Sequence, residues 1–222
     1  MHPLVKDIVT LYHSNADEVN AAGAKAYLRH QFNFHGLKTP LRRGLAKEVF
    51  KQYPITTEAD LIIIAKELWQ LPEREYQYAC IELVARHKKL WTANIISFFH
   101  YLITTKSWWD TVDFIVNEHL ASYFKLFPEQ IVPVTGKWNK SDNIWLQRSS
   151  IIFQKSYKKA LDTKLLTQYI LNCSSSKEFF IQKAIGWVLR EYARTNPQWV
   201  IEFVRNNNLA ALSKREAMKH LG

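Results

Sequence analysis

The stretch Phe180-Ile-Gln-Lys-Ala-Ile-Gly-Trp-Val-Leu-Arg-Glu-Tyr192 decides the fold class of this chain. Its apolar residues recur three and four positions apart, which places them on one face of an α-helix. The same spacing recurs over 61–68. Only 6 Gly and 7 Pro occur among the 222 residues, and no Asn-Gly or Asp-Gly pair signals a β-hairpin. The sequence therefore predicts an all-α protein of about 12–13 helices with short connections.

An internal repeat predicts how these helices are arranged. Gln77, Gln147 and Gln182 each stand two residues before a small residue, and their separations of 70 and 35 define a unit of 35 residues. A unit of this length holds two helices, and a chain of such pairs is typical of an α-solenoid. No linker or low-complexity stretch divides the sequence, so we predict a single domain over residues 1–222.

Two capping boxes predict where late helices begin. In this motif a Ser at the helix start is followed three residues later by Glu, and each side chain hydrogen-bonds the backbone of the other residue. Ser175 and Glu178 have this spacing, as do Ser213 and Glu216. We therefore expect helices to start at these two serines.

The charge balance points to a polyanionic partner. Lys and Arg number 30 against 20 for Asp and Glu, a formal net charge of +10. Nucleic acid is the commonest polyanion that such an excess attracts, although a general solubility role would give the same composition. The 8 Trp and 10 Tyr add aromatic faces suited to sugars and bases. Basic groups beside aromatic rings thus favour nucleic-acid binding.

Several other classes of protein are disfavoured by the sequence. No signal peptide is recognised, and the apolar runs are too short to span a membrane, so we predict a cytoplasmic protein without membrane partners. Cys80 and Cys173 lie in apolar contexts that indicate buried thiols. No Gly-rich phosphate loop, HExxH, GxSxG or CxxC motif occurs, and the eight His show no paired ligand spacing. We therefore expect no cofactor and no metal ion.

The 35-residue register predicts a basic wall along the helices. Equivalent positions read Arg43, Tyr78, Asp113, Arg148 and Lys183. Such a wall is suited to DNA phosphates, because Arg donates two parallel hydrogen bonds to them. Residues seven positions away share the same helix face. The cations predicted to line this wall are Arg43, Lys106, Arg148, Lys183 and Arg190.

Asp113 is the one acid in this row. It either forms a salt bridge to Arg148 or Lys106, or it performs chemistry on a bound polyanion. Trp109 stands four residues before Asp113 on the same helix face, and Trp187 stands four after Lys183. A carboxylate with flanking indoles among cations is the candidate site.

Two adjacent tryptophans must point in different directions. Neighbouring side chains on a helix diverge by about 100°, so Trp108 and Trp109 cannot enter the same core. We expect Trp108 to point inward with Val112 and Ile115, and Trp109 to face the wall.

Five stretches carry a resemblance to a known family. They are Thr39–Arg43, Leu68–Glu75, Thr105–Asp113, Ser141–Arg148 and Ser175–Tyr192. With these stretches the chain resembles the AlkD-like DNA alkylation repair glycosylases, which are built from HEAT-like helical repeats. The resemblance implies a curved superhelix whose basic concave face holds duplex DNA. It also implies the removal of purines alkylated at N3 or N7.

The resemblance also assigns roles to individual residues. Asp113 matches the family's catalytic carboxylate, Trp109 and Trp187 match the aromatics around the lesion sugar, and Arg148 matches a cation near the phosphates. The DNA footprint that the resemblance implies in the N-terminal part of the chain includes Tyr27, Lys38 and Thr39.

The implied reaction suits these residue types. An alkylated purine is positively charged and leaves readily, so the barrier lies in the cationic deoxyribose, which a carboxylate and indole faces stabilise. We expect a monomer that acts on double-stranded DNA containing alkylated purines without an obligatory protein partner. The alternative is a non-catalytic basic α-solenoid that binds nucleic acid or an acidic protein, with Asp113 merely bridging Arg148.

Overall fold

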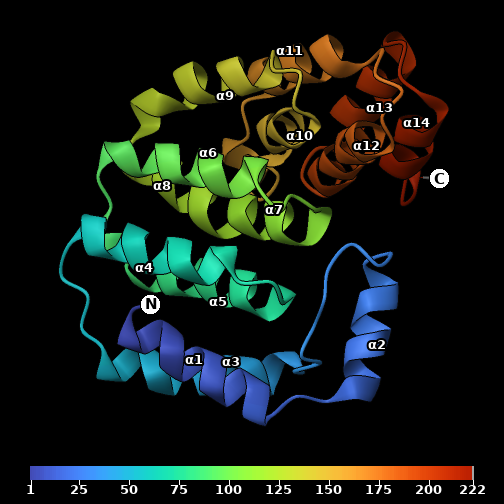
Figure 1. The fold of residues 1–222 in the computed structure, drawn as a ribbon. Helices are drawn as coiled ribbons and strands as arrows, with labels where there is room; N and C mark the ends of the chain where they lie inside the picture. The colour runs from blue at the N-terminus through green and yellow to red at the C-terminus, as the bar shows by residue number, and fades with distance from the viewer. Residues whose placement is uncertain (222) are drawn as a thin grey trace. The chain divides into compact units, whose positions relative to one another are not determined.

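The computed structural model describes residues 1–221 and is helical from end to end (Figure 1). Within these residues no β-strand forms, and a single isolated bridge joins Asn33 to Glu73. The predicted all-α fold is therefore confirmed. The chain separates into two compact units, Met1–Phe98 and the part that begins at Phe99, and each is described here by itself.

The first unit is built from two packed helix pairs and one peripheral helix. Helix α1 packs against α3, and α4 packs against α5. Apolar side chains such as Ile8 and Leu61 are completely buried between them. Helix α2 contributes no buried residue. The bounds are α1 Pro3–Ser14, α2 Glu18–Tyr27, α3 Thr39–Gln52, α4 Glu58–Gln70 and α5 Arg74–Arg86.

The second unit continues the pattern of stacked helices. Helix α10 packs against α9 and α12, and α12 packs closely against α14. Its bounds are α6 Ile96–Thr104, which begins just before the unit boundary, α7 Trp109–Ile115, α8 Ala121–Leu126, α9 Ile131–Asn139, α10 Ile144–Ile152, α11 Thr163–Cys173, α12 Phe179–Ala193, α13 Pro197–Asn206 and α14 Ala211–Met218.

A π-helical segment, Val116–Leu120, joins α7 to α8 without a break. Counted as one helix, this run leaves thirteen α-helices among the described residues, within the predicted range. Among residues 1–221, no helix combines the length and the apolar character that crossing a membrane requires.

The 35-residue repeat is visible in long-range contacts within the second unit. The hydroxyl of Thr135 lies 2.8 Å from that of Tyr169, 34 residues away. The amide of Asn139 donates to the carbonyl of the same Tyr169 at 3.2 Å, and Arg148 binds Asp113 35 residues before it. These contacts join α9 to α11 and α7 to α10, as expected for helix pairs that stack on their neighbours.

The two expected capping boxes are wrong. Helix α12 begins at Phe179 and has no side-chain cap. Helix α14 begins at Ala211, so Ser213 lies inside the helix, where its hydroxyl donates to the Gln182 carbonyl at 2.8 Å. Close packing of α14 on α12 explains the difference, because Ser213 satisfies its hydroxyl across the helix contact instead of at a helix end.

Candidate functional site

Asp113 of α7 and Arg148 of α10 form an ion pair between neighbouring helices. The Arg148 Nε and Nη2 atoms donate to the two carboxylate oxygens of Asp113, each at 2.8 Å. Arg148 is buried and the Asp113 side chain is 14% exposed. This geometry is the planar two-bond pairing that guanidinium and carboxylate groups prefer. The salt bridge to Arg148, one of the two alternatives for Asp113, is therefore present.

Arg148 is not placed as a phosphate ligand. Besides its two bonds to Asp113, its Nη1 atom donates to the Phe180 carbonyl at 2.7 Å. A side chain that is only 5% exposed and bonded through three nitrogens has little left to offer a DNA phosphate. Tertiary packing turns the Arg148 guanidinium toward Asp113, and its contact with a DNA phosphate stays a prediction. In this position it fixes the carboxylate.

The Asp113 carboxylate keeps capacity for a further partner. Its two oxygens offer about four lone-pair positions, and Arg148 occupies one on each oxygen. Since part of the side chain is exposed, a water molecule or a cationic group can approach the remaining positions. The arrangement can therefore orient water and stabilise positive charge.

Trp187 of α12 lies beside this pair and carries a cation on its face. The Lys155 Nζ atom is 3.9 Å from the ring centroid of Trp187, and the Arg148 Cζ atom is 5.8 Å from it. Because Arg148 contacts both Asp113 and Trp187, the carboxylate and the indole belong to one site. Cation–π contacts of this kind contribute about 0.5–2 kcal/mol.

Lys155 is a residue of this site that the sequence analysis did not assign. Burial lowers the pKa of its ammonium group, while the Glu191 and Asp113 carboxylates act in the opposite direction and Arg148 adds to the lowering. Its position seven residues after Arg148, on the predicted wall, was the sequence signal that could have identified it. The Trp187 face beside Asp113 therefore accepts a positive charge.

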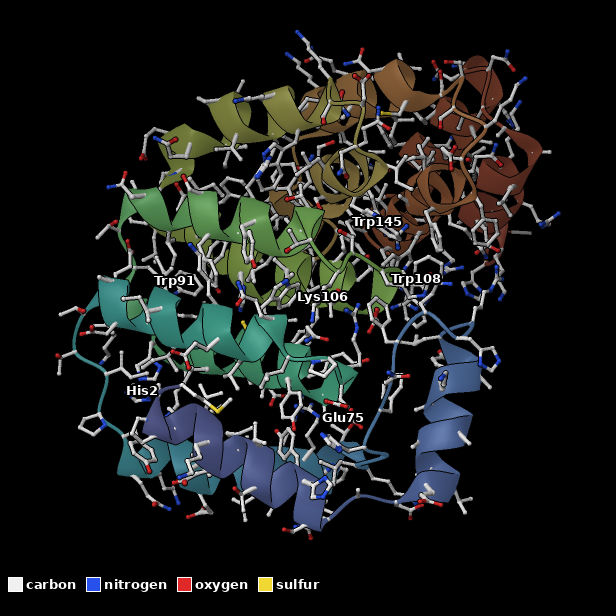
Figure 2. All side chains as sticks on the ribbon, in the orientation of Figure 1. His2, Glu75, Trp91, Lys106, Trp108 and Trp145 are labelled. Atoms are coloured by element: carbon white, nitrogen blue, oxygen red, sulfur yellow. The ribbon has the colours of Figure 1, made fainter. Side chains whose placement is uncertain are left out.

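The two adjacent tryptophans stand at the start of α7. Trp108 precedes α7 in an extended conformation and packs against Phe180 and Trp145, with ring centroids 5.1 and 5.9 Å away (Figure 2). It is half-buried and lies just outside the helix, and its packing with Val112 stays a prediction. Trp109 is the first residue of α7 and is also half-buried, one helical turn before Asp113.

Lys183 and Arg190 of α12 share a carboxylate from α14. The Lys183 Nζ lies 2.9 Å from Glu216 Oε1, and the Arg190 Nη1 lies 2.8 Å from Oε2. The hydrogen bond from Lys183, together with the charge of Arg190, lowers the pKa of the Glu216 carboxyl. A Cβ at Gly186 would collide with Glu216 and Ser213, so this close approach of α14 requires glycine. Packing of α14 on α12 thus neutralises part of the charge of these two wall cations, and their contact with DNA stays a prediction.

The remaining predicted wall cations occupy different settings. Arg43, in the first unit, is 56% exposed and binds Glu82 at 2.8 Å. The neighbouring Arg42 is buried and binds both oxygens of the same Glu82. In the second unit, Lys106 is half-buried in the turn before α7, with a left-handed φ of 47° that is uncommon outside glycine.

Three further predicted DNA contacts lie on the surface of the first unit. Tyr27, at the end of α2, is 73% exposed. Lys38 is the residue before α3 and Thr39 is its first residue, and both are exposed. These side chains are accessible to a ligand.

The described part of the chain contains no candidate metal site and no thiol suited to nucleophilic attack. No group of three or more His, Cys, Asp and Glu in residues 1–221 could hold a metal ion. Cys80 and Cys173 are free and buried, and burial raises the pKa of both thiols. A raised pKa disfavours the thiolate, so neither is suited to act as a nucleophile.

Comparisons with known proteins agree on one family. A family model described as DNA alkylation repair enzyme matches residues 8–221. A solved structure of a predicted DNA alkylation repair enzyme from Enterococcus faecalis is 33% identical, with a TM-score of 0.86 over 93% of this chain and 97% of that one.

A second solved structure shows likeness of fold alone. The protein smu.31 of Streptococcus mutans UA159 is 15% identical and covers 82% of this chain and 96% of its own, with a TM-score of 0.62. No curated protein matches the chain. Because the family model spans nearly the whole sequence, the chain belongs to the DNA alkylation repair enzyme family.

Proposed function

We propose that this repair enzyme is a DNA glycosylase that excises positively charged N3- or N7-alkylated purines from duplex DNA. Its family makes it an enzyme of the repair of alkylated DNA. The observation that carries the finer proposal is the site where Asp113, held by Arg148, lies beside an indole face that already carries the Lys155 ammonium. A carboxylate beside an indole face is suited to a cationic sugar, which would displace the Lys155 ammonium from that face.

The chemistry follows from where charge develops. As the N-glycosidic bond breaks, its electron pair neutralises the alkylated purine, and positive charge moves to the deoxyribose ring. The Asp113 carboxylate stabilises that charge and accepts a hydrogen bond from the water that attacks C1′. The faces of Trp187 and Trp109 add about 0.5–2 kcal/mol each by cation–π attraction. A leaving group that is already cationic needs little general acid, which suits a site with a single central carboxylate.

Arg148 acts in this proposal as a positioning residue. Two bonds at 2.8 Å fix the plane of the Asp113 carboxylate. Its positive charge also weakens the attraction between Asp113 and a sugar cation. The net effect is a fixed acceptor that keeps unused lone pairs and is partly exposed.

Asp113→Asn tests the proposal directly. The amide keeps the shape of the side chain but removes the negative charge, so single-turnover release of 7-methylguanine from duplex DNA should fall by about 100-fold or more, as when one charge-stabilising group is lost. Binding of the same duplex should persist or increase, because a repulsive acid is gone. Thermal melting of the variant serves as the folding control.

The outcome separates two functions. A well-folded Asp113→Asn protein that excises at the parental rate removes Asp113 from the mechanism. A parent protein that binds alkylated duplex but releases no purine favours the non-catalytic DNA-binding solenoid instead.

A further inference from the structure

A basic hollow lies next to the candidate site in the second unit. The segment between α10 and α11 and the end of α12 enclose about 490 Å³. Half of the lining residues are cations. The lining consists of Tyr157, Lys158, Lys159, Ala160, Arg194 and Thr195.

The cations of this hollow differ from the predicted wall cations. Within residues 1–221, no hydrogen bond or ion pair links the exposed Lys158 or Lys159 to an acidic side chain. Arg194 is 70% exposed and has one contact, at 3.3 Å, with Glu191. By comparison, all three guanidinium nitrogens of Arg148 donate hydrogen bonds to Asp113 or the Phe180 carbonyl. The positive charge of the hollow is therefore available to an incoming anion.

A smaller hollow extends this basic surface. It has a volume of about 290 Å³ and shares Tyr157 and Ala160 with the first. Lys125 of α8 lies in its lining, together with Ser156. Lys125, Lys158, Lys159 and Arg194 thus surround two adjoining depressions.

The hollow and Trp187 lie along one face of α12. On α12, Trp187, Glu191 and Arg194 follow one another at spacings of four and three residues, which places them on one helix face. Lys155 lies on the Trp187 ring, and the chain that follows it reaches Arg194 at the hollow. Seven residues of helix span about 10 Å, and a DNA strand advances about 3.4 Å along its axis per phosphate. About three successive phosphates match that length.

We propose that Lys158, Lys159 and Arg194 form a binding site for the DNA backbone phosphates next to the lesion. The proposal rests on the proposed function only in placing the lesion sugar at Trp187. We call Lys158, Lys159 and Arg194 the phosphate cradle. In this proposal the cradle contributes part of the DNA affinity that the sequence had assigned to the wall cations, which are partly neutralised.

The salt dependence of DNA binding tests the cradle. The double variant Lys158→Ala/Lys159→Ala is compared with Lys137→Ala/Lys164→Ala, which removes the same charge from exposed positions on α9 and α11 outside both hollows. Affinity for undamaged duplex is measured at several salt concentrations. Removing one cation that binds a phosphate lowers the slope of log K against log salt by about 0.9, so the slope should fall by about 1.8 for the cradle variant and much less for the control.

A modified duplex locates the phosphates that the cradle binds. Methylphosphonate groups, which carry no charge, replace single phosphates beside a tetrahydrofuran abasic analogue. One of these methylphosphonates should weaken DNA binding by the parent protein. The same methylphosphonate should have little effect on DNA binding by the cradle variant or by Arg194→Ala. The losses of binding free energy caused by removing the phosphate charge and by removing the cation would then be non-additive, as expected for groups that contact each other.

The result does not depend on excision. Equal salt slopes for the cradle and control variants, with melting temperatures like that of the parent, would overturn the cradle even if Asp113→Asn abolishes purine release. A reduced slope confined to the cradle variant supports the site even if the parent releases no purine, in which case the proposed glycosylase function fails separately.

Discussion

Replacing Arg148 with Ala tests whether this residue positions Asp113 or binds a phosphate. The change removes two 2.8 Å bonds to Asp113 and one 2.7 Å bond to the Phe180 carbonyl. Breaking a buried ion pair by removing one partner costs about 3–5 kcal/mol, because the other charge stays without compensation. In a protein of this size 1 kcal/mol corresponds to about 2–4 °C, so the melting temperature should fall by about 6–20 °C.

The matched control is Arg215→Ala, which removes the same charge from an exposed position on α14. A surface change of this kind stays within about 0.5 kcal/mol of the parent. At a temperature where Arg148→Ala is still folded, its salt slope for undamaged duplex should equal that of the control. Purine excision should fall, because Asp113 is no longer fixed.

The opposite pattern would refute this reasoning. If Arg148→Ala melts with the control and its salt slope falls by about 0.9, then Arg148 binds a phosphate and Asp113 needs no support from it.

Two other perturbations follow from the packing of the tryptophans and from the α12–α14 contact. Trp108→Ala removes a ring packed on Phe180 and Trp145 and should cost about 3 kcal/mol, whereas Trp109→Ala should lower the excision rate with a smaller change in melting temperature; equal melting losses would contradict this assignment. Glu216→Gln should lower the melting temperature by about 2–4 °C at pH 7. Because the native pKa of Glu216 is lowered, its stabilisation is complete above the ordinary carboxyl pKa and is lost as the pH falls through the native value, so parent and variant should converge once the pH is below that native value; a constant difference would show that the ion pairs do not stabilise α14.

The sequence alone determined the helical fold and predicted that Asp113 and Arg148 share a surface. Helix formation follows the spacing of apolar residues, which the stretch Phe180–Tyr192 displays directly. A repeat of 35 residues placed Asp113 and Arg148 at equivalent positions, and the structure shows them in contact. The periodicity of the sequence predicts which helix face a residue occupies. It therefore indicated that the side chains of Asp113 and Arg148 share a surface.

Only the tertiary structure decided which charges are already paired. Glu216 lies 26 residues from Arg190 and 33 from Lys183, and it meets both because α14 packs on α12 over Gly186. The sequence predicted Glu216 to be a capping residue, because its spacing from Ser213 matches the capping-box motif. Its partners Lys183 and Arg190 are distant in the sequence and could not be predicted from that motif. A side chain's partner depends on which helix packs beside it. For the same reason, the Lys155 cation on Trp187 and the basic hollow that follows it emerged only from the fold.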